Sequence, residues 1–250
     1  MPRAVTRAMQ ILEMLGNSEA GLTHAHISKE LRIPKSSTTP ILSDLISTQF
    51  ISFNKDTKRY SLGPKIVSLV HNYLEDLELI RAAEPVVKEL SIMTGESVAL
   101  YIRVGGEAQL ICKQNSPQPV LRLLKVGDRA PLYAHASGKI LLAYQSDEDI
   151  VQYLSSTPLI PLTPYTITDF VRLREEVEQI RSGSLSYNRE EFNEGVFGIG
   201  APVYDRKGDV IAALSIVAPS FRVNEEKIRS LENMLLEKSI SLSKGLGFEG

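Results

Sequence analysis

The sequence predicts an α+β protein in two parts, a small three-helix unit with a β-hairpin and a larger α/β domain built on an antiparallel sheet. Apolar residues recur three times at helical spacing before two short strand-like runs within the first 63 residues. Farther along the chain, strand-like runs follow one another across short turns, with helical segments between them. The charge is divided in the same way: residues 1–70 have nine Lys or Arg against five Asp or Glu, and residues 71–250 have 19 against 25.

The composition limits the classes of function. The chain has 250 residues, 43% of them hydrophobic, and a formal net charge of −2, which suits one large folded domain or two smaller ones. A single cysteine excludes an intrachain disulfide and a multi-cysteine metal site, and four histidines leave little for a histidine site. No apolar run approaches the roughly 20 residues of a membrane-spanning helix, and a signal-peptide core is missing. We expect a soluble cytoplasmic protein with no metal, cofactor or membrane partner.

Three helices are expected in the first part. Apolar positions over 5–15 define the first helix. Thr23 is a good N-cap for a second helix over 24–32, and Pro34 ends that helix because proline disfavours a helical residue before it. A third helix starts near Lys35.

A β-hairpin follows the third helix. Residues 50–53 and 58–62 are strand-like, and the polar turn 54–57 lies between them. The expected order of elements is that of a winged helix-turn-helix: helix, helix, tight turn, helix and hairpin. In this motif the third helix enters the major groove of DNA. The balance of +4 on residues 1–70, against −6 on the remainder, favours a nucleic-acid partner for this part of the chain.

The residues at the expected reading surface fit DNA. The start of the third helix supplies one cation and four hydroxyls, which suit base edges and phosphate oxygens, and the hairpin adds three cations. In the alternative, the Ser/Thr run only caps a helix and the hairpin charges are only solvated, although capping needs one such residue rather than four. The expected DNA contacts are Arg7, Lys35, Ser36, Ser37, Thr38, Thr39, Lys55, Lys58 and Arg59.

A linker and the second domain follow. Residues 64–81 are predicted to form one helix whose apolar stripe packs against a partner subunit or against its own domain; both alternatives stay open. Antiparallel pairing is expected because the turns at Gly105-Gly106 and 205–208 join successive strands. Strands are predicted over 97–104, 109–114, 120–124, 199–204 and 210–217, and helices over 82–93, 137–145, 147–155, 168–182 and 224–242.

Motifs of enzymes are incomplete in this chain. Ser137 lacks the glycines of a nucleophile elbow, and Gly198-Ile-Gly200 is half of a dinucleotide fingerprint. Cys112 lies mid-strand and is expected to be a buried, inert thiol. The adjacent carboxylates Glu190-Glu191 would face opposite sides of a strand, and His24 and His26 point to different helix faces and form no joint metal site. We therefore expect no catalytic residue and no enzyme.

A binding pocket fits the second domain better. The run Ala134 to Ser137 leads directly into a helix, and the free N–H groups of a helix N-terminus bind carboxylates and similar anions. Small residues at this point let a ligand approach the backbone.

Five phrases in register over residues 4 to 220 give the chain a resemblance to the IclR family of bacterial transcription regulators. These phrases are AVTRAMQIL at 4–12, IPKSS at 33–37, RYSLG at 59–63, AHASGKILLA at 134–143 and EFNEGVFGIGAPVYD at 191–205. The resemblance implies a winged helix-turn-helix over 1–63, a linker and dimerisation helix over 64–81, and a GAF-like α/β effector domain over 82–250. It also implies a homodimer, or a dimer of dimers, on a palindromic double-stranded DNA operator.

The resemblance also implies where an effector binds. The backbone amides of Ala136 and Ser137 would hold the anionic end of a small carboxylate-type metabolite, and the far wall would be formed by Asn188, Gly198, Ser215 and Val217. Glyoxylate-sensing members of the family have an acid, a cysteine and two serines at these four far-wall positions. Here the wall is less polar, so we expect a larger organic acid than glyoxylate, with Tyr133 and Phe197 either at the pocket mouth or in the core.

Pro40 departs from the family pattern, which has a basic or polar residue after the Ser/Thr run. A helix that begins at Lys35 would have this proline in its second turn and be kinked there, whereas a later start would make it harmless. The expected function is a ligand-responsive, sequence-specific DNA-binding regulator. The alternative is a sensing or protein-interaction module whose DNA binding Pro40 has weakened.

Overall fold

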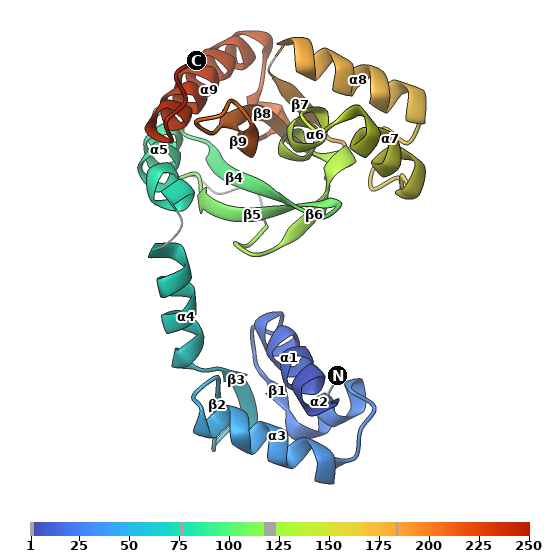
Figure 1. The fold of residues 1–250 in the computed structure, drawn as a ribbon, viewed down its shortest axis with the longest axis vertical. Helices are drawn as coiled ribbons and strands as arrows, with labels where there is room; N and C mark the ends of the chain where they lie inside the picture. The colour runs from blue at the N-terminus through green and yellow to red at the C-terminus, as the bar shows by residue number, and fades with distance from the viewer. Residues whose placement is uncertain (1–2, 76–77, 118–123, 184) are drawn as a thin grey trace. The chain divides into compact units, whose positions relative to one another are not determined.

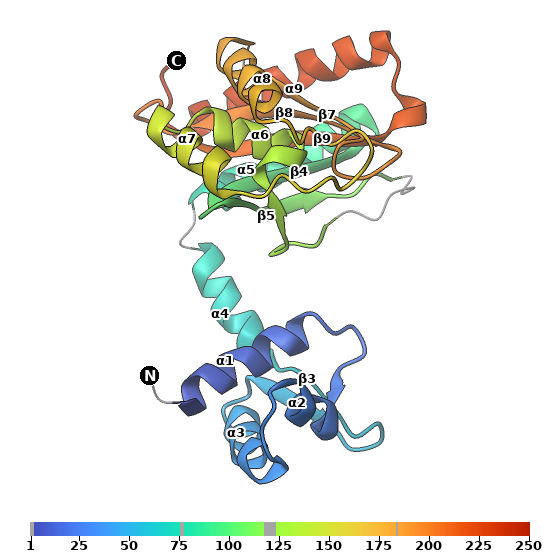
Figure 2. The same ribbon diagram turned by 90° about the vertical axis from the view of Figure 1, so that its right-hand side faces the viewer.

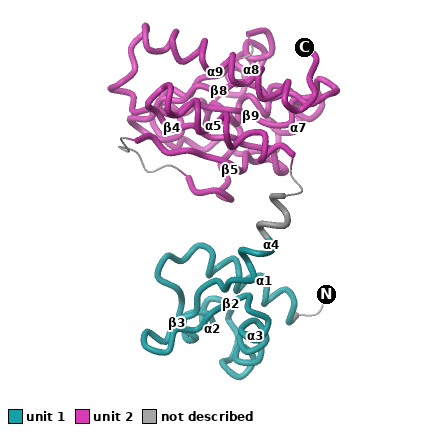
Figure 3. The backbone as a smooth tube through the Cα atoms, turned by 90° about the vertical axis from the view of Figure 1, so that its left-hand side faces the viewer, with its two compact units in different colours: residues 1–77 teal, residues 78–250 magenta. Residues whose placement is uncertain are grey.

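A computed structural model describes residues 3–75, 78–117, 124–183 and 185–250. The chain forms two compact units, residues 1–77 and residues 78–250, which Figure 3 distinguishes by colour. Each unit has a hydrophobic core of its own.

The first unit is a winged helix-turn-helix. Its helices are α1 (Arg3–Gly16), α2 (His24–Glu30), α3 (Lys35–Ser47) and α4 (Pro64–Glu75). Its strands β1 (Leu22–Thr23), β2 (Ile51–Asn54) and β3 (Arg59–Leu62) form an antiparallel sheet in the order β1-β3-β2. The core consists of Ile11, Leu15, Ile27, Leu42, Leu45 and Ile51. The predicted N-cap is confirmed, because the Thr23 side chain accepts a hydrogen bond from the His26 amide.

The second unit is built on a six-stranded antiparallel sheet in the order β6-β5-β4-β9-β8-β7. The strands are β4 (Ser97–Val104), β5 (Glu107–Gln114), β6 (Arg129–Pro131), β7 (Ser186–Arg189), β8 (Val196–Tyr204) and β9 (Val210–Pro219). The expected α+β fold with an antiparallel sheet is therefore confirmed.

Helices cover both faces of this sheet (Figures 1 and 2). One face carries α5 (Glu78–Thr94) and α9 (Glu225–Gly245), and the other carries α6 (Ala136–Ala143), α7 (Asp147–Ser156) and α8 (Phe170–Gly183). Short 3₁₀ turns over Leu132–Ala134 and Ser220–Arg222 precede α6 and α9. Side chains alternate along each strand, so Leu214 packs under α5 and α9 while Ala213 and Ser215 face α6.

Several predicted elements differ from the structure. The helix expected over 64–81 is α4 followed by the first residues of α5, with residues 76–77 outside the described part of the chain. Most of the strand expected over 120–124 also lies outside it, and Leu124 is not in a strand. Strands β1, β6 and β7 were not predicted because they have only two to four residues, too few for an alternating pattern to be recognised.

Among the described residues, no helix is long and apolar enough to cross a membrane.

Candidate functional site

A cavity of about 280 Å³ lies in the second unit, where the start of α6 meets β7, β8 and β9. The structure brings all six predicted effector residues together on its wall: Ala136, Ser137, Asn188, Gly198, Ser215 and Val217. Sequence reasoning missed the remaining lining residues, Tyr101, Leu124, His135, Phe192, Asn193, Glu194 and Val196. Tyr133 and Phe197 are buried in the core and do not line this cavity.

The first wall is the beginning of α6. His135 is the N-cap of this helix, and its Nδ1 accepts a hydrogen bond of 3.3 Å from the Gly138 amide. Only glycine fits at 138, because a Cβ there would lie 2.5 Å from the carbonyl oxygen of Leu132. Within the described residues, no group accepts a hydrogen bond from the amides of Ala136 and Ser137. These amides are therefore free for a ligand.

The second wall is the sheet itself. Gly198 on β8 pairs with Val217 on β9, and Ser215 lies two residues back on the same face. The hydroxyl of Ser215 donates a hydrogen bond to the Ala99 carbonyl at 3.3 Å. A Cβ at Gly198 would lie 3.3 Å from the Asn188 Cβ, so the absence of a side chain at 198 keeps this part of the cavity open.

The third wall is Asn188 with the turn over 190–195. The Oδ1 atom of Asn188 accepts hydrogen bonds from the amides of Glu191 (2.8 Å) and Phe192 (3.3 Å), which fixes the turn against the end of β7. Phe192 then contributes its ring to the cavity, where it lies 5.7 Å from the ring of His135.

The cavity offers hydrogen-bond donors but no cationic side chain among its described lining residues. Burial, helped by the positive charge of Lys139, lowers the pKa of His135 to about 3, so this imidazole is neutral. Because Nδ1 accepts the Gly138 amide, the proton of the neutral ring is on Nε2. The Nε2 atom of His135 and the hydroxyl of Ser137 are buried without a hydrogen-bond partner among the described residues. A bound ligand would satisfy such groups.

Replacing His135 with asparagine is expected to make the second unit less sensitive to acid. Asparagine retains an oxygen that can cap α6 but does not titrate. The folded-state pKa of about 3 lies below that of the unfolded chain, so the unfolded chain takes up the proton first and stability falls as the pH drops below about 6.5. Between about pH 7 and pH 5, the wild type should lose about 2 kcal/mol more than His135→Asn. Urea unfolding at both pH values measures this, and equal losses would contradict a buried neutral imidazole.

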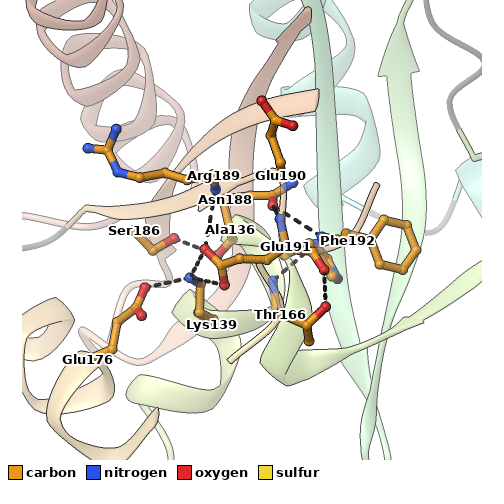
Figure 4. A network of polar contacts seen from close by, with 12 residues as sticks. Ala136, Lys139, Thr166, Glu176, Ser186, Asn188, Arg189, Glu190, Glu191 and Phe192 are labelled. Carbon is orange, nitrogen blue, oxygen red and sulfur yellow. Dashed lines mark hydrogen bonds and ion pairs between the residues drawn. The ribbon is translucent and has the colours of Figure 1, made fainter. Parts of the chain in front are cut away.

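A buried charge network supports two walls of the cavity (Figure 4). Lys139 on α6 is fully buried, and its Nζ donates to Glu191 Oε2 at 2.8 Å, to Glu191 Oε1 at 3.0 Å and to Glu176 Oε1 on α8. The Arg189 amide also donates to Glu191. Lys139 thus ties the turn over 190–195 and α8 to the helix that begins at the cavity. Sequence reasoning missed this role, although a lone lysine within the apolar run 134–143 was a signal for a buried, paired charge.

Two other sequence interpretations can be compared with the structure. Cys112 is buried, as predicted, and burial raises the pKa of its thiol to about 11. Glu190 and Glu191 were expected on opposite faces of a strand, but they follow β7 in the turn, with Glu190 half-buried and Glu191 buried against Lys139.

The candidate DNA-binding surface lies on the first unit. On α3, Lys35, Ser36 and Thr39 are exposed and Ser37 is half-buried. Lys55, Lys58 and Arg59 are exposed on the β2–β3 hairpin, and Arg7 is half-buried on α1. The turn of the hairpin is held by Asn54, whose Oδ1 accepts from the amides of Asp56 and Thr57.

Thr38 is a correction to the predicted DNA contacts. Its side chain is fully buried, donates to the Pro34 carbonyl and accepts from the Ser28 hydroxyl at 3.1 Å. A hydroxyl in this position joins α3 to α2 and cannot reach DNA. Arg59, although exposed, also has a structural role, because its Nη1 donates to the Gly21 carbonyl at 2.6 Å.

Pro40 lies inside α3, which begins at Lys35 and ends at Ser47. The helix therefore begins at Lys35, and the proline is in its second turn, where it has no N–H to offer the carbonyl of Ser36. The kink expected for such a start stays a prediction. The Pro40 side chain is exposed, beside Thr39.

The comparisons with known proteins agree with both parts of this structure. The family described as "Bacterial transcriptional regulator IclR C-terminal" matches residues 71–244, and the "IclR helix-turn-helix domain" matches residues 4–54. The chain belongs to the IclR family. It is a DNA-binding transcription regulator with a ligand-binding C-terminal domain, and not an enzyme.

Relatives resemble this IclR-family chain over nearly its whole length. The HTH-type transcriptional repressor AllR of Klebsiella pneumoniae is 30% identical over 247 residues, which are 99% of this chain and 91% of the relative. The Thermotoga maritima IclR structure has a TM-score of 0.85 at 28% identity, covering 99% of this chain and 100% of that one. An IclR homolog from Microbacterium hydrocarbonoxydans, complexed with 4-hydroxybenzoate, has a TM-score of 0.88 at 23% identity, covering 97% and 98%.

Proposed function

We propose that this IclR-family regulator senses a small organic acid larger than two carbons, which binds in the cavity at the start of α6. The observation that carries the proposal is the set of free donors there: the amides of Ala136 and Ser137 and the unpartnered hydroxyl of Ser137. They suit a carboxylate, while the apolar wall of Val196, Val217 and Phe192 suits a carbon skeleton or ring.

The size of the cavity favours such a ligand over a two-carbon acid. About 280 Å³ is far more than glyoxylate fills, and Gly198 and Val217 supply neither charge nor hydroxyl on the far wall. The IclR homolog from Microbacterium hydrocarbonoxydans, which shares this fold, was crystallised with 4-hydroxybenzoate. A monocyclic aromatic or sugar-derived acid is therefore the class of effector to test first.

A thermal-shift screen of metabolite acids, with 4-hydroxybenzoate and glyoxylate among them, tests the effector proposal. We expect ring-sized acids to raise the melting temperature and glyoxylate to have little effect. Gly198→Val should abolish the shift because its side chain would occupy the cavity beside Asn188, and Ser215→Ala should reduce it by removing a hydroxyl from the wall. Shifts that survive both changes would place the ligand elsewhere. Val151→Ala, an exposed position on α7, is a matched control.

We further propose that DNA is read by the exposed residues at the start of α3 and on the hairpin, in a homodimer or a dimer of dimers on a palindromic operator. Apolar Val67 and Leu69 on α4 are exposed within this chain, which supports α4 as part of a subunit contact. Effector binding would change the distance between the two winged helix-turn-helix units of a dimer, which contact half-sites about one helical turn apart.

A second candidate function is that of a sensing module with weakened DNA affinity. The observation that favours it is Pro40, which removes a backbone donor from the second turn of α3. Binding of the full-length protein to its own upstream DNA at several salt concentrations separates the two. A regulator should bind with a steep salt dependence, whereas the sensing module should bind weakly at every salt concentration.

Pro40→Arg is expected to change the sequence preference of the protein. Position 40 is exposed on α3 next to Thr39, and an arginine there can donate two hydrogen bonds to a guanine edge, which proline cannot. Selection from random DNA with both proteins measures the preference. An unchanged preferred sequence would contradict the expected contact between residue 40 and a base edge.

A further inference from the structure

A second cavity lies in the second unit, between the turn of the β4–β5 hairpin and α7. Its volume is about 250 Å³, close to the 280 Å³ of the effector cavity, and the two cavities share no lining residue among those described. Leu132 and Leu142, which are buried against the same core, give it an apolar wall. Pockets for drug-sized ligands have roughly 300–1,000 Å³, so a cavity of this size suits a small metabolite.

Arg103 on β4 presents a guanidinium group at this cavity. Its Nε donates to the Gly105 carbonyl at 2.8 Å, and its Nη1 donates to the side-chain oxygen of Gln145. These two bonds hold the group in place, while its Nη2 has no acceptor and its charge no ion-pair partner within the described part of the chain. An arginine held in this way is suited to a carboxylate.

Asp149, in the first turn of α7, brings the opposite charge to the same cavity. Its amide donates to the Ser146 hydroxyl at 3.1 Å, but its exposed carboxylate forms no ion pair with any described residue, Arg103 included. Asp149 would repel a simple anion, and Arg103 would repel a simple cation. A ligand that carries both charges satisfies both side chains.

Tyr153 on α7 contributes a buried hydroxyl to the cavity. The residue is 8% exposed, and its hydroxyl forms no hydrogen bond with the described residues. Burial raises the pKa of Tyr153 to about 12, although the nearby amides of Tyr133 and Leu132 and the side chain of Thr157 act to lower it. The hydroxyl therefore keeps its proton and can donate it to a ligand, which would remove the cost of leaving a buried donor unpaired.

We infer that this cavity is a second small-molecule site of the regulator, which binds a polar α-amino acid. The carboxylate of the ligand pairs with Arg103, its ammonium group pairs with Asp149, and an oxygen of its side chain accepts a hydrogen bond from Tyr153. The site is independent of the effector proposal, because it uses none of the residues that line the effector cavity.

Isothermal titration calorimetry of the full-length protein with L-serine, L-threonine, L-asparagine and L-glutamine tests this inference. We expect at least one of the four to bind in a one-site isotherm. Analogues of that amino acid without the amino group, or without the carboxylate, should bind roughly tenfold or more weakly, because each lacks one charged contact. If none of the four binds at concentrations up to about 10 mM, or if an analogue with a single charge binds as well, the inference is wrong.

Substitutions then locate the bound amino acid. Asp149→Asn and Arg103→Gln should each weaken binding roughly tenfold or more, and Tyr153→Phe should weaken it roughly threefold or more. Glu148→Gln is the matched control, because this exposed carboxylate is the neighbour of Asp149 on α7 and does not line the cavity; it should leave the affinity unchanged.

Gly198→Val distinguishes the two sites. It narrows the effector cavity next to Asn188 and should therefore leave amino-acid binding unchanged. Binding that is lost in Gly198→Val, or that persists unchanged in Asp149→Asn and Arg103→Gln, would place the amino acid outside the second cavity and overturn the inference. Neither result depends on whether organic acids bind in the effector cavity, so a failure of that proposal is seen separately in the thermal-shift screen.

Discussion

Lys139→Met is expected to destabilise the second unit by about 3–5 kcal/mol, because it leaves the buried carboxylate of Glu191 without its cation. Lys139 is fully buried and Glu191 is 6% exposed, so water cannot replace the lost partner. Glu176 is more exposed, at 25% of its side chain, and contributes less to the loss. Urea unfolding of the full-length protein, followed by circular dichroism, measures the change in free energy of unfolding.

The pH dependence of this variant provides a second measurement. Burial raises the pKa of Glu191 even beside Lys139, and removal of the lysine should raise it further. A carboxyl group whose folded-state pKa is raised costs stability at pH values above that pKa, and the cost disappears as the pH falls through it and the group is protonated. The deficit of Lys139→Met should therefore shrink in acid.

Two comparisons make the result specific to the buried pair. Adding Glu191→Leu to Lys139→Met should recover much of the lost stability, since a buried ion pair replaced by apolar side chains often costs little. Arg174→Ala removes an exposed partner of Glu178 one helical turn away on α8 and should cost less than about 0.5 kcal/mol. A loss for Lys139→Met no larger than that for Arg174→Ala would contradict the role assigned to the network.

Replacing Lys35, Lys55 and Lys58 together with alanine is expected to weaken DNA binding about a hundredfold at 0.15 M salt, with a log–log salt slope shallower by about 2.7. All three side chains are exposed, one at the start of α3 and two on the hairpin. Each cation that neutralises a phosphate releases condensed counterions, which is why affinity and salt slope fall together. Titration of a mixed-sequence duplex at four or more salt concentrations measures both quantities.

The control for this variant is the removal of two cations elsewhere on the first unit, compared per charge removed. Lys29→Ala removes an exposed cation near the end of α2, and Arg32→Ala removes one in the turn that follows; both lie outside the proposed contacts. The double variant Lys29→Ala, Arg32→Ala should change the log–log salt slope of DNA binding far less per charge removed. Equal effects per charge would mean that DNA is attracted by the net charge of the unit and not bound by α3 and the hairpin. Thermal unfolding of each variant verifies that the unit remains folded.

Some helices and strands could be predicted from the sequence, and others could not. Helices α6 and α9, with strands β4, β8 and β9, lie at or near the predicted positions, because each has a long apolar pattern that burial on one or both faces imposes. The short strands β6 and β7 carry no such pattern, and they form only because β5 and β8 are already in place to pair with them. The formation of a short edge strand depends on pairing with the neighbouring strand more than on the propensity of its own residues.

The residues of the two candidate sites could likewise be predicted only in part. The six effector residues could be predicted because the family resemblance, carried by phrases that include the start of α6 and Gly198, implies their positions, and the structure places all six around one cavity. The Ser/Thr run on α3 was expected to contact DNA as a whole. A helix has a buried face and an exposed face, however, and Thr38 points to the buried one. Only the packing of α3 on α2 decides which hydroxyl is lost to the core.

The sequence by itself determined that this protein has a basic N-terminal winged helix-turn-helix and an acidic α/β domain with a small-residue helix start, since charge, spacing and turn residues act locally along the chain. The tertiary structure alone decided which distant groups meet: Lys139 with Glu176 and Glu191, His24 with Thr39, and the unpartnered Ser137 hydroxyl with the apolar wall. The His24–Thr39 contact and the contacts of Lys139 join residues that are 15 to 52 positions apart in the chain. Their energies arise from burial in a low-dielectric interior and from hydrogen-bond geometry, which exist only once the chain has folded.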